Sequence, residues 1–430
     1  MKNLLTIYLC SILTLTGCAQ TQTANPRFED LDQLLTSGQF ITLKQELQRA
    51  TRSFGNNPYQ YYDAHCYNAF GEYNKSILAA NRMLVQYAKS MNHEELIRLL
   101  DLQARNYHNT YHYKQSAELY ASILNRLNKH LSEEMRINYQ NHYIINKTLA
   151  EAQVGKQQAH IKQDYQIPIF HNQFDHLMVP VASKAKHDHF ILDTGAMIST
   201  ISASNAERLG FRILDSKIEV DTSTNISIQT KLGIADSLYL GDILLENVVF
   251  LVTDDSDLYI AQEDYKIAGI LGFPVLQQLK EIRINLPENR IEVPLTPSKR
   301  DFTNLYMYKE KPVVRMYAGQ DTLRMALDTG ANKSELSLTY FNRHQEEIKS
   351  VASYKEVERG SAGGSIKEQV YIYPNFEFKL GSKKATLPLI TINLSDYHFI
   401  TGMDGNLGQD VYTQFDKLVM NFQQMFIDFE

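Results

Sequence analysis

The sequence predicts a multidomain chain in which an N-terminal α-helical repeat region is followed by two related all-β lobes. Three observations support this fold class. Apolar residues recur at three- and four-residue spacing until about residue 158, where short alternating apolar runs replace them. The phrase Asp-Thr-Gly-Ala occurs twice in the second half, at 193–196 and at 328–331. The residues after each phrase then match one another in order, which indicates an internal duplication.

Length and composition are ordinary for a globular protein. The 430 residues are sufficient for two or three domains with hydrophobic cores. The apolar fraction is 43% and the charged fraction is 21%, as in most soluble domains. The net charge of −6 provides no basic surface for phosphate groups, so nucleic acid is not expected as a partner.

The first residues have the pattern of a secretory signal rather than of a folded element. Lys2 precedes a short apolar run that ends in Leu15-Thr16-Gly17-Cys18. The run is too short to span a bilayer. Its ending resembles a bacterial lipobox, which implies removal of residues 1–17, a lipid on Cys18 and a tether over 18–26. The chain would then be lipid-anchored in the cell envelope, at the outer membrane or the periplasmic face. An ordinary signal peptide with a chance Cys18 is the alternative.

Residues 27–160 are expected to form helix pairs with an internal repeat. The repeated pattern consists of a small residue, an aromatic residue and a turn that ends in a second aromatic residue. Its copies are Ala64, Tyr67, Gly71 and Tyr73, then Ala104, Tyr107, Tyr111 and Tyr113, with a fainter one at Leu31, Leu34, Gly38 and Phe40. The pattern resembles tetratricopeptide repeats. That resemblance implies a concave surface that binds a protein partner; a helical spacer without a ligand is the alternative.

The duplicated part predicts two homologous β lobes, at 165–297 and 298–430. Gly272 of a Leu-Gly pair lies 79 residues after Asp193, and Gly408 of a second Leu-Gly pair lies 80 residues after Asp328. From these pairs onward the two halves align without a gap. Matched positions include Val275 with Val411, Gln278 with Gln414 and Asn285 with Asn421.

Two carboxylates at matched positions suggest an acid–base pair. Related lobes that pack about a pseudo-twofold axis would bring Asp193 and Asp328 face to face. Two carboxyl groups at such short range cannot both ionise, so they share one proton. The ionised member can then take a proton from a water while the protonated member donates to a carbonyl oxygen. This chemistry uses no metal and no cofactor.

The two turns, together with Ile270-Leu271-Gly272 and Asn406-Leu407-Gly408, resemble the pepsin and retropepsin aspartic peptidases. The Ala after each Gly is the retropepsin form, whereas two lobes in one chain is the pepsin arrangement. The resemblance covers roughly residues 165–430 and implies a bilobal aspartic-peptidase-like β fold. It implies that Asp193 and Asp328 hold the catalytic water and that Thr194 and Thr329 hydrogen-bond across the lobe interface. It also implies that Gly195 and Gly330 let backbone groups approach the carboxylates.

The sequence also departs from that family at three places. Pepsin-type enzymes carry a flap hairpin with a Tyr in the first lobe, and the corresponding residues 222–233 contain none. Residues 359–365 of the second lobe are Gly-rich, which is compatible with a hairpin over the cleft or with an ordinary surface turn. Asn406 stands where an apolar residue is usual in the family.

The leading functional hypothesis is a membrane-anchored aspartic endopeptidase, a hydrolase that acts on a peptide or protein substrate. One alternative is a catalytically inactive envelope lipoprotein that binds peptides or proteins through the cleft or the helical repeats. Another is a scaffold in which the β lobes are only structural. The segment His187-Asp188-His189 looks like part of a metal site, but no third ligand is evident and a solvated loop is favoured.

Overall fold

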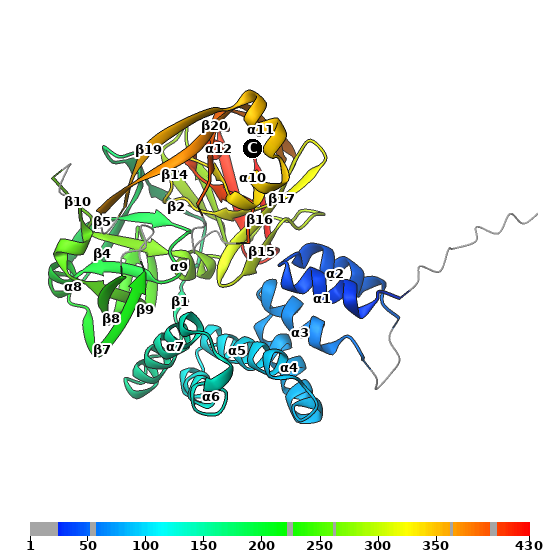
Figure 1. Ribbon diagram of the computed structural model, residues 1–430. Helices are drawn as coiled ribbons and strands as arrows, with labels where there is room; N and C mark the ends of the chain where they lie inside the picture. Colours follow the sequence, from blue (N-terminus) through cyan, green and yellow to red (C-terminus); the bar gives the residue numbers. More distant parts are fainter. Residues whose placement is uncertain (1–24, 52–56, 222–226, 261–263, 362–363, 396–401) are drawn as a thin grey trace, which may run out of the picture.

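A computed structural model of the chain confirms a helical region followed by a β-rich region (Figure 1). The expected signal peptide over 1–17 and Cys18 lie outside the described residues. Within the described part of the chain, no helix is both long enough and apolar enough to cross a membrane. The structure describes residues 25–51, 57–221, 227–260, 264–361, 364–395 and 402–430.

The helical region forms a curved layer of antiparallel pairs along one side of the β lobes (Figure 1). α5 begins at a capping box, where the Asn92 side chain accepts from the Glu95 N–H and the Glu95 carboxylate accepts from the Asn92 N–H. The helices are α1 (Phe28–Thr36), α2 (Phe40–Arg49), α3 (Gln60–Ala69), α4 (Tyr73–Tyr87), α5 (His93–Asn109), α6 (Tyr113–Arg126) and α7 (Glu133–Glu151). A 3₁₀ turn, η1 (Asn128–His130), separates α6 from α7.

The turns within the first three helix pairs have the same backbone form. Gly38, Gly71 and Tyr111 occupy the aligned turn position of the three sequence copies, and each has a positive φ of 64–73°. Glycine adopts this conformation without strain, and Tyr111 adopts it at an energetic cost. The sequence repeat therefore coincides with a structural repeat of helix hairpins.

Lobe 1 (165–297) is a sheet that closes on itself, and β1, at the end of the region 27–160 that was expected to be helical, joins this sheet by pairing with β9. Its hydrogen-bonded strand order is β1-β9-β6-β12-β5-β4-β8-β7. In addition, β8 pairs with β9 and β3 pairs with β4. A separate short hairpin is formed by β10 (Tyr259–Ile260) and β11 (Tyr265–Lys266), after η2 (Asp255–Leu258). The other elements are β1 (Gln158–Ala159), β3 (Phe170–His171), β4 (Leu177–Ser183), β5 (Lys186–Asp193), β6 (Ser199–Ser202), α8 (Ala203–Arg208), β7 (Arg212–Asp221), β8 (Ser227–Leu240), β9 (Ile243–Thr253), β12 (Gly269–Gly272) and α9 (Phe273–Gln278).

Lobe 2 (298–430) repeats this topology. Its order is β15-β16-β17-β22-β18-β21-β20-β19, and β16 also pairs with β20. In each lobe the strand before the Asp turn pairs in parallel with the Leu-Gly strand. The elements are β15 (Leu305–Tyr308), β16 (Lys311–Ala318), β17 (Asp321–Leu327), β18 (Glu335–Leu336), α10 (Leu338–Arg343), α11 (Gln345–Val351), β19 (Ser353–Ser361), β20 (Gly364–Leu380), β21 (Lys383–Asn393), β22 (Gly405–Leu407) and α12 (Gln409–Tyr412).

A sheet shared between the lobes shows the pseudo-twofold relation directly. It consists of β2 (Tyr165–Pro168), β14 (Arg290–Val293), β13 (Glu281–Asn285), β23 (Lys417–Asn421) and β24 (Phe426–Phe429), in that order. From the Leu-Gly pairs onward, residues that are 136 positions apart are equivalent in the sequence duplication. Arg283 and Val419 are such a pair, and they lie opposite each other where β13 meets β23. The axis therefore passes between them.

The helical region packs against both lobes rather than standing apart. Toward lobe 1, Tyr113 and Leu149 share a buried cluster with Ile218 and Leu232. Toward lobe 2, Phe40 lies 5.9 Å from Tyr306 between ring centroids. The Arg324 guanidinium also donates to the Ser37 carbonyl, so the region is joined to the lobes by apolar and polar contacts.

Candidate active site

The two Asp turns lie at the ends of matched strands. Asp193 is the last residue of β5, and Asp328 directly follows β17. Leu192 pairs with Leu271 of the neighbouring Leu-Gly strand, and Leu327 pairs with Leu407. Because these leucines are all buried, the strand ends hold the turns in fixed positions.

The structure brings the two carboxyl groups together across the lobe interface. A Cβ built on Gly195 would lie 2.8 Å from Cγ of Asp328, and one on Gly330 would lie 2.6 Å from Cγ of Asp193. Each glycine therefore packs against the carboxyl group of the opposite lobe. Neither glycine has a positive φ, so glycine is needed here for the space that the opposite carboxyl group occupies and not for conformational freedom.

Thr194 and Thr329 exchange hydrogen bonds between the lobes. The Thr194 hydroxyl donates to the Leu327 carbonyl at 3.0 Å and accepts from the Thr329 N–H at 3.0 Å. The Thr329 hydroxyl donates to the Leu192 carbonyl at 2.9 Å and accepts from the Thr194 N–H at 3.0 Å. Both side chains are fully buried. These four bonds fix the separation of the two turns.

The two carboxyl groups differ in their hydrogen-bond partners. The Gly195 N–H donates to Oδ1 of Asp193 at 2.6 Å. Oδ1 of Asp328 accepts from the N–H groups of Gly330 and Ala331 at 3.0 and 3.1 Å. Its Oδ2 accepts from Nδ2 of Asn406 at 3.0 Å. Asn406 thus forms part of the site.

The electrostatics of the pair favour one shared proton. Burial, followed by the charge of Asp328, raises the pKa of Asp193 to about 8, against the lowering effect of the Gly195 N–H. Asp193 therefore keeps a proton well above the pH at which an exposed Asp loses it. A carboxylic acid beside a carboxylate can serve as both acid and base.

Two serines link the segments after the Asp turns to the ends of the Leu-Gly strands. They were not singled out as site residues from the sequence. Ser199 and Ser334 each lie six residues after their Asp. Their hydroxyl groups accept from the N–H groups of Gly272 and Gly408, at 3.0 and 2.9 Å. Equal spacing from the two Asp residues was the signal that could have identified them.

A second matched pair, His176 and Lys311, lies beside the dyad. Each residue precedes the Asp of its own lobe by 17 positions. Burial lowers the pKa of His176, and nearby Asp175 and Asp328 oppose this effect. Burial lowers the pKa of Lys311 to about 8, again against the charge of Asp328. Both lobes thus supply a basic side chain near the carboxylates.

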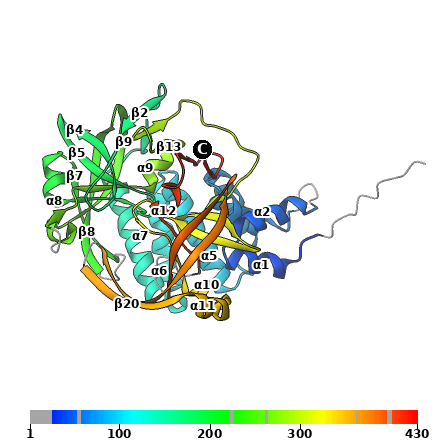
Figure 2. The same cartoon turned by 90° about the horizontal axis from the view of Figure 1, so that it is seen from above.

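Each lobe also carries one long hairpin at the same place in its sheet. The β7–β8 hairpin of lobe 1 and the β19–β20 hairpin of lobe 2 occupy equivalent places in the two sheet orders. The orange β19–β20 hairpin extends from lobe 2 toward lobe 1 in both views (Figures 1 and 2). The Gly-rich stretch 359–365 is at its turn, whereas residues 222–226 and 362–363 lie outside the described residues.

The other candidate features do not form a site. Asp188 in the His187-Asp188-His189 segment accepts from Asn205 at 2.9 Å and pairs with Arg208. Its carboxylate is therefore occupied by protein groups. Within the described ranges, no cluster of three or more His, Cys, Asp or Glu side chains has the arrangement of a metal site.

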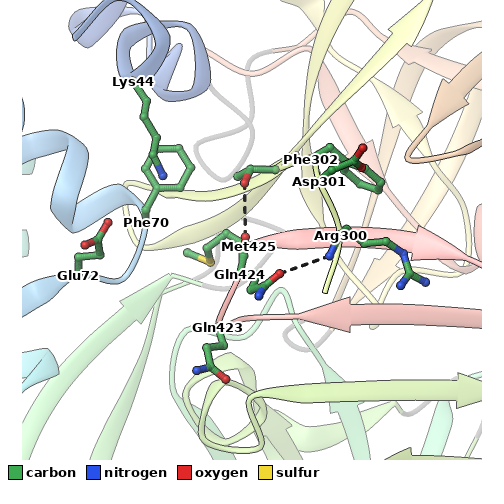
Figure 3. Close-up of a pocket in the computed structure, with 10 residues that line it drawn as sticks. Lys44, Phe70, Glu72, Arg300, Asp301, Phe302, Gln423, Gln424 and Met425 are labelled. Carbon is green, nitrogen blue, oxygen red and sulfur yellow. Dashed lines mark hydrogen bonds between the residues drawn. The ribbon is translucent and has the colours of Figure 1, made fainter. Parts of the chain in front are cut away.

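A cavity of about 350 Å³ lies between the helical region and lobe 2, away from the dyad (Figure 3). Lys44 and Phe70 line it from the helices, with the Lys44 ammonium 3.9 Å from the ring centroid. Arg300 lines it from lobe 2 and is already paired with Asp428 and Glu430. Because Lys44 and Arg300 already have protein partners, we interpret the cavity as a packing gap between the helical region and lobe 2 and not as a ligand site.

Comparison with known families agrees with the geometry of lobe 1. Residues 179–275 match the sequence model of a family described as Aspartyl protease. This part of the chain is similar to aspartyl proteases. The matched segment contains the Asp193 turn and its Leu-Gly strand, and it ends before the Asp328 turn. No curated protein matches the chain. Lobe 2 is related to that segment through the duplicated topology.

Proposed function

We propose that the chain is an aspartic endopeptidase that hydrolyses peptide bonds with a water activated between Asp193 and Asp328. One observation carries the proposal: two carboxyl groups from duplicated lobes face each other across glycines that leave room for nothing larger. The similarity of residues 179–275 to aspartyl proteases supports it.

The chemistry follows from one proton shared by two carboxyl groups. The ionised carboxylate removes a proton from the water as its oxygen bonds to the scissile carbonyl carbon. The protonated carboxyl donates its proton to the carbonyl oxygen, which gives a tetrahedral diol. Collapse of the diol breaks the C–N bond as the proton taken from water passes to the leaving nitrogen, and one diol hydroxyl returns its proton to the other carboxylate as the product carbonyl forms. The dyad returns to its singly protonated state, and no metal or cofactor takes part.

The pH dependence of this reaction is set by the dyad. Cleavage requires one proton on the pair, and burial and charge hold a proton on Asp193 up to about pH 8. Activity is therefore expected at and below neutral pH and is expected to fall as the pH rises through that value. Activity that increases steadily into alkaline solution would contradict a shared-proton dyad.

The test is cleavage of a mixed peptide library by the chain from residue 19 onward, with the products mapped by mass spectrometry. Asp193→Asn and Asp328→Asn should each lower the cleavage rate by about 10³-fold or more, because each removes one half of the acid–base pair. Asp236→Asn is the matched control, since Asp236 is a largely exposed lobe 1 carboxylate that pairs with Arg212. Equal rates in all four proteins, or no cleavage by the parent chain, would overturn the proposal and favour a peptide-binding lipoprotein.

We also propose that the protein is anchored in the bacterial cell envelope by a lipid on Cys18. The support is the short apolar run before Leu15-Thr16-Gly17-Cys18. Mass spectrometry of the membrane fraction should find a diacylglyceryl group on an N-terminal Cys18. A Cys18→Ala variant should be recovered in the soluble fraction or with its signal uncleaved. An unmodified Cys18 in the parent protein would reject the anchor.

The helical region is proposed to be a tetratricopeptide-like module that holds the catalytic lobes and offers its remaining surface to a protein partner. The repeated hairpin turns at Gly38, Gly71 and Tyr111 support this assignment. The packing of Phe40 on Tyr306 supports the holding role. Crosslinking of the intact protein in cells, followed by mass spectrometry, should map partner crosslinks to the helices. Crosslinks confined to contacts within the chain would limit the region to a structural role.

A further inference from the structure

The strand that lines the dyad carries a different side chain in each lobe. Asn406 of β22 and Ile270 of β12 are equivalent, since both precede the Leu-Gly pair and pair with the strand that leads to the Asp. Asn406 is only 4% exposed and donates from Nδ2 to Oδ2 of Asp328 at 3.0 Å. Ile270 has no polar atom to offer to Asp193. The duplicated site is therefore unequal at this matched position.

This inequality determines where a negative charge is best accommodated. An amide N–H can only donate, so Asn406 stabilises Asp328 more when its carboxylate is ionised. Asp328 then receives donors on both oxygens: two backbone N–H groups on Oδ1 and Asn406 on Oδ2. In the part of the chain that the structure describes, Asp193 receives backbone N–H donors from its own turn and no side-chain amide.

We propose that Asn406 is a positioning residue that keeps Asp328 as the ionised member of the dyad and leaves the shared proton on Asp193. Asp328 is then the base that takes the proton from water, and Asp193 is the acid that donates to the carbonyl oxygen. The kinetic part of this inference rests on the proposed peptidase function, whereas the location of the proton does not. The raised pKa of Asp193 agrees with the assignment.

Two of the other groups around the pair act in the same direction, and the remaining two are a neutral phenol and the Asp410 carboxyl group, which is bound to Ser334. His176 precedes β4 and Lys311 begins β16, and both have Asp328 among the carboxylates that raise their pKa. A positive charge on either would also stabilise an ionised Asp328. Tyr412 of α12 is a buried neutral phenol, because burial followed by the two Asp charges raises its pKa well above the usual value. Asp410, whose pKa is raised by burial, accepts hydrogen bonds from Ser334.

Two reagents of opposite preference can locate the proton without any substrate. Phenyl glycidyl ether alkylates a carboxylate. The carboxylate oxygen bonds to a carbon of the epoxide, the C–O bond of the epoxide breaks, and water protonates the resulting alkoxide. Diazoacetyl glycine ethyl ester reacts with a carboxylic acid: the acid protonates the diazo carbon, dinitrogen leaves, and an ester forms. In the parent protein at mildly acidic pH, the epoxide should label Asp328 and the diazo reagent should label Asp193, as read by peptide mapping.

The side-chain exchange between the lobes provides the decisive comparison. Asn406→Ile should give mixed labelling of Asp193 and Asp328 by each reagent, and Ile270→Asn should also do so by adding a second donor. The double variant, Ile270→Asn with Asn406→Ile, should invert the labelling. If both single variants label as the parent does, or if the parent itself labels both residues equally, the assignment is wrong. The single variant in lobe 1 keeps the test valid if the lobe 2 variant does not fold.

The pH profile of peptide cleavage gives a second readout. Loss of a hydrogen bond to the ionised carboxylate should move the acid limb of kcat/KM in Asn406→Ile to higher pH by about one unit. Asn406→Ser retains a short donor and should restore part of the shift. An unchanged acid limb with a lower maximum would indicate a structural role only and would contradict the proposal. Selective labelling in a protein that cleaves no peptide would reject the peptidase function and leave the proton assignment standing.

Discussion

Lobe 1 and lobe 2 place equivalent strands around the dyad but surround it with different side chains. The strand order, the parallel Leu-Gly pairing and the threonine exchange are the same on both sides of the axis. The side chains near the carboxyl groups differ at several matched positions, and three of these pairs bear on the dyad. These pairs are His176 and Lys311, Ile270 and Asn406, and Leu276 and Tyr412. Duplication supplies a symmetric frame, and the unequal side chains give the two carboxyl groups different surroundings.

The lobes also differ in how the helical region contacts them. Lobe 1 presents an apolar sheet face to α7, where Ile145 and Leu149 pack. Lobe 2 presents the β15–β16 turn, whose Glu310 carboxylate lies 3.6 Å from His142. The residue after Glu310 is Lys311, beside Asp328. The helices therefore pack on the sheet of lobe 1, whereas in lobe 2 they contact the turn that precedes Lys311.

The largest effect is expected at Gly195 and Gly330, where the two lobes approach each other closely and in the same way. Gly195→Ala and Gly330→Ala each place a methyl group against the carboxyl group of the opposite lobe. If the proposed dyad is catalytic, displacing one of its carboxyl groups by a fraction of an ångström should lower kcat about 10²-fold in both variants. Gly155→Ala is the control, because Gly155 has no positive φ and an added Cβ there meets only the Asn247 side chain. Unequal losses in the two glycine variants would show that the lobes do not contribute equally to the frame.

The threonine exchange should give equal losses of stability on the two sides. Thr194→Val and Thr329→Val each remove one buried hydroxyl that donates to a carbonyl and accepts from an N–H of the other lobe. Each should lower the free energy of unfolding by about 1–3 kcal/mol, measured by chemical denaturation. Thr230→Val removes a single 3.3 Å bond within lobe 1 and should cost less. A larger loss in the control would contradict a locking role for the exchange.

The pH dependence of stability should reveal the shared proton. Because the pKa of Asp193 is raised from 3.8 to about 8 in the folded chain, its contribution is fully present below about pH 4 and is lost as the pH rises through about 8. Asp193→Asn should remove this decline. Asp328→Asn should also reduce it, since the charge of Asp328 is one cause of the shift. Denaturation curves with the same slope against pH in all three proteins would contradict coupling between the lobes.

The sequence was sufficient to predict the Asp turns and the Leu-Gly strands because both are repeated within the chain. Asp193 and Asp328 could be singled out since each follows an apolar strand and precedes a Leu-Gly pair at nearly equal distance. The contacts between lobes could not be derived in this way. In the sequence, Asn406 is notable only because an apolar residue is usual at its position. The fold is needed to show that Nδ2 of Asn406 lies 3.0 Å from Oδ2 of Asp328. The helix-to-lobe contacts join residues hundreds of positions apart, such as Phe40 and Tyr306, and no local pattern encodes such pairs.

The smallest expected effect concerns the third unequal pair, Leu276 and Tyr412, beneath the dyad. Tyr412 is 3% exposed, and its hydroxyl has no hydrogen-bond partner among the described residues. A buried hydroxyl without a partner loses its hydration and gains nothing in return. Tyr412→Phe keeps the ring and removes that cost, so the free energy of unfolding should rise by up to about 1 kcal/mol in urea denaturation.

Tyr62→Phe provides the opposite control for this prediction, because the Tyr62 hydroxyl donates to Oδ1 of Asp32 at 2.9 Å and its removal should lower stability. Since Tyr412 is neutral throughout the working range, Tyr412→Phe should leave both limbs of the pH profile in place. A loss of stability in Tyr412→Phe, or a shifted limb, would mean that the hydroxyl does interact with the carboxyl groups. In that case Tyr412 would join Asn406 as a source of the asymmetry between the lobes.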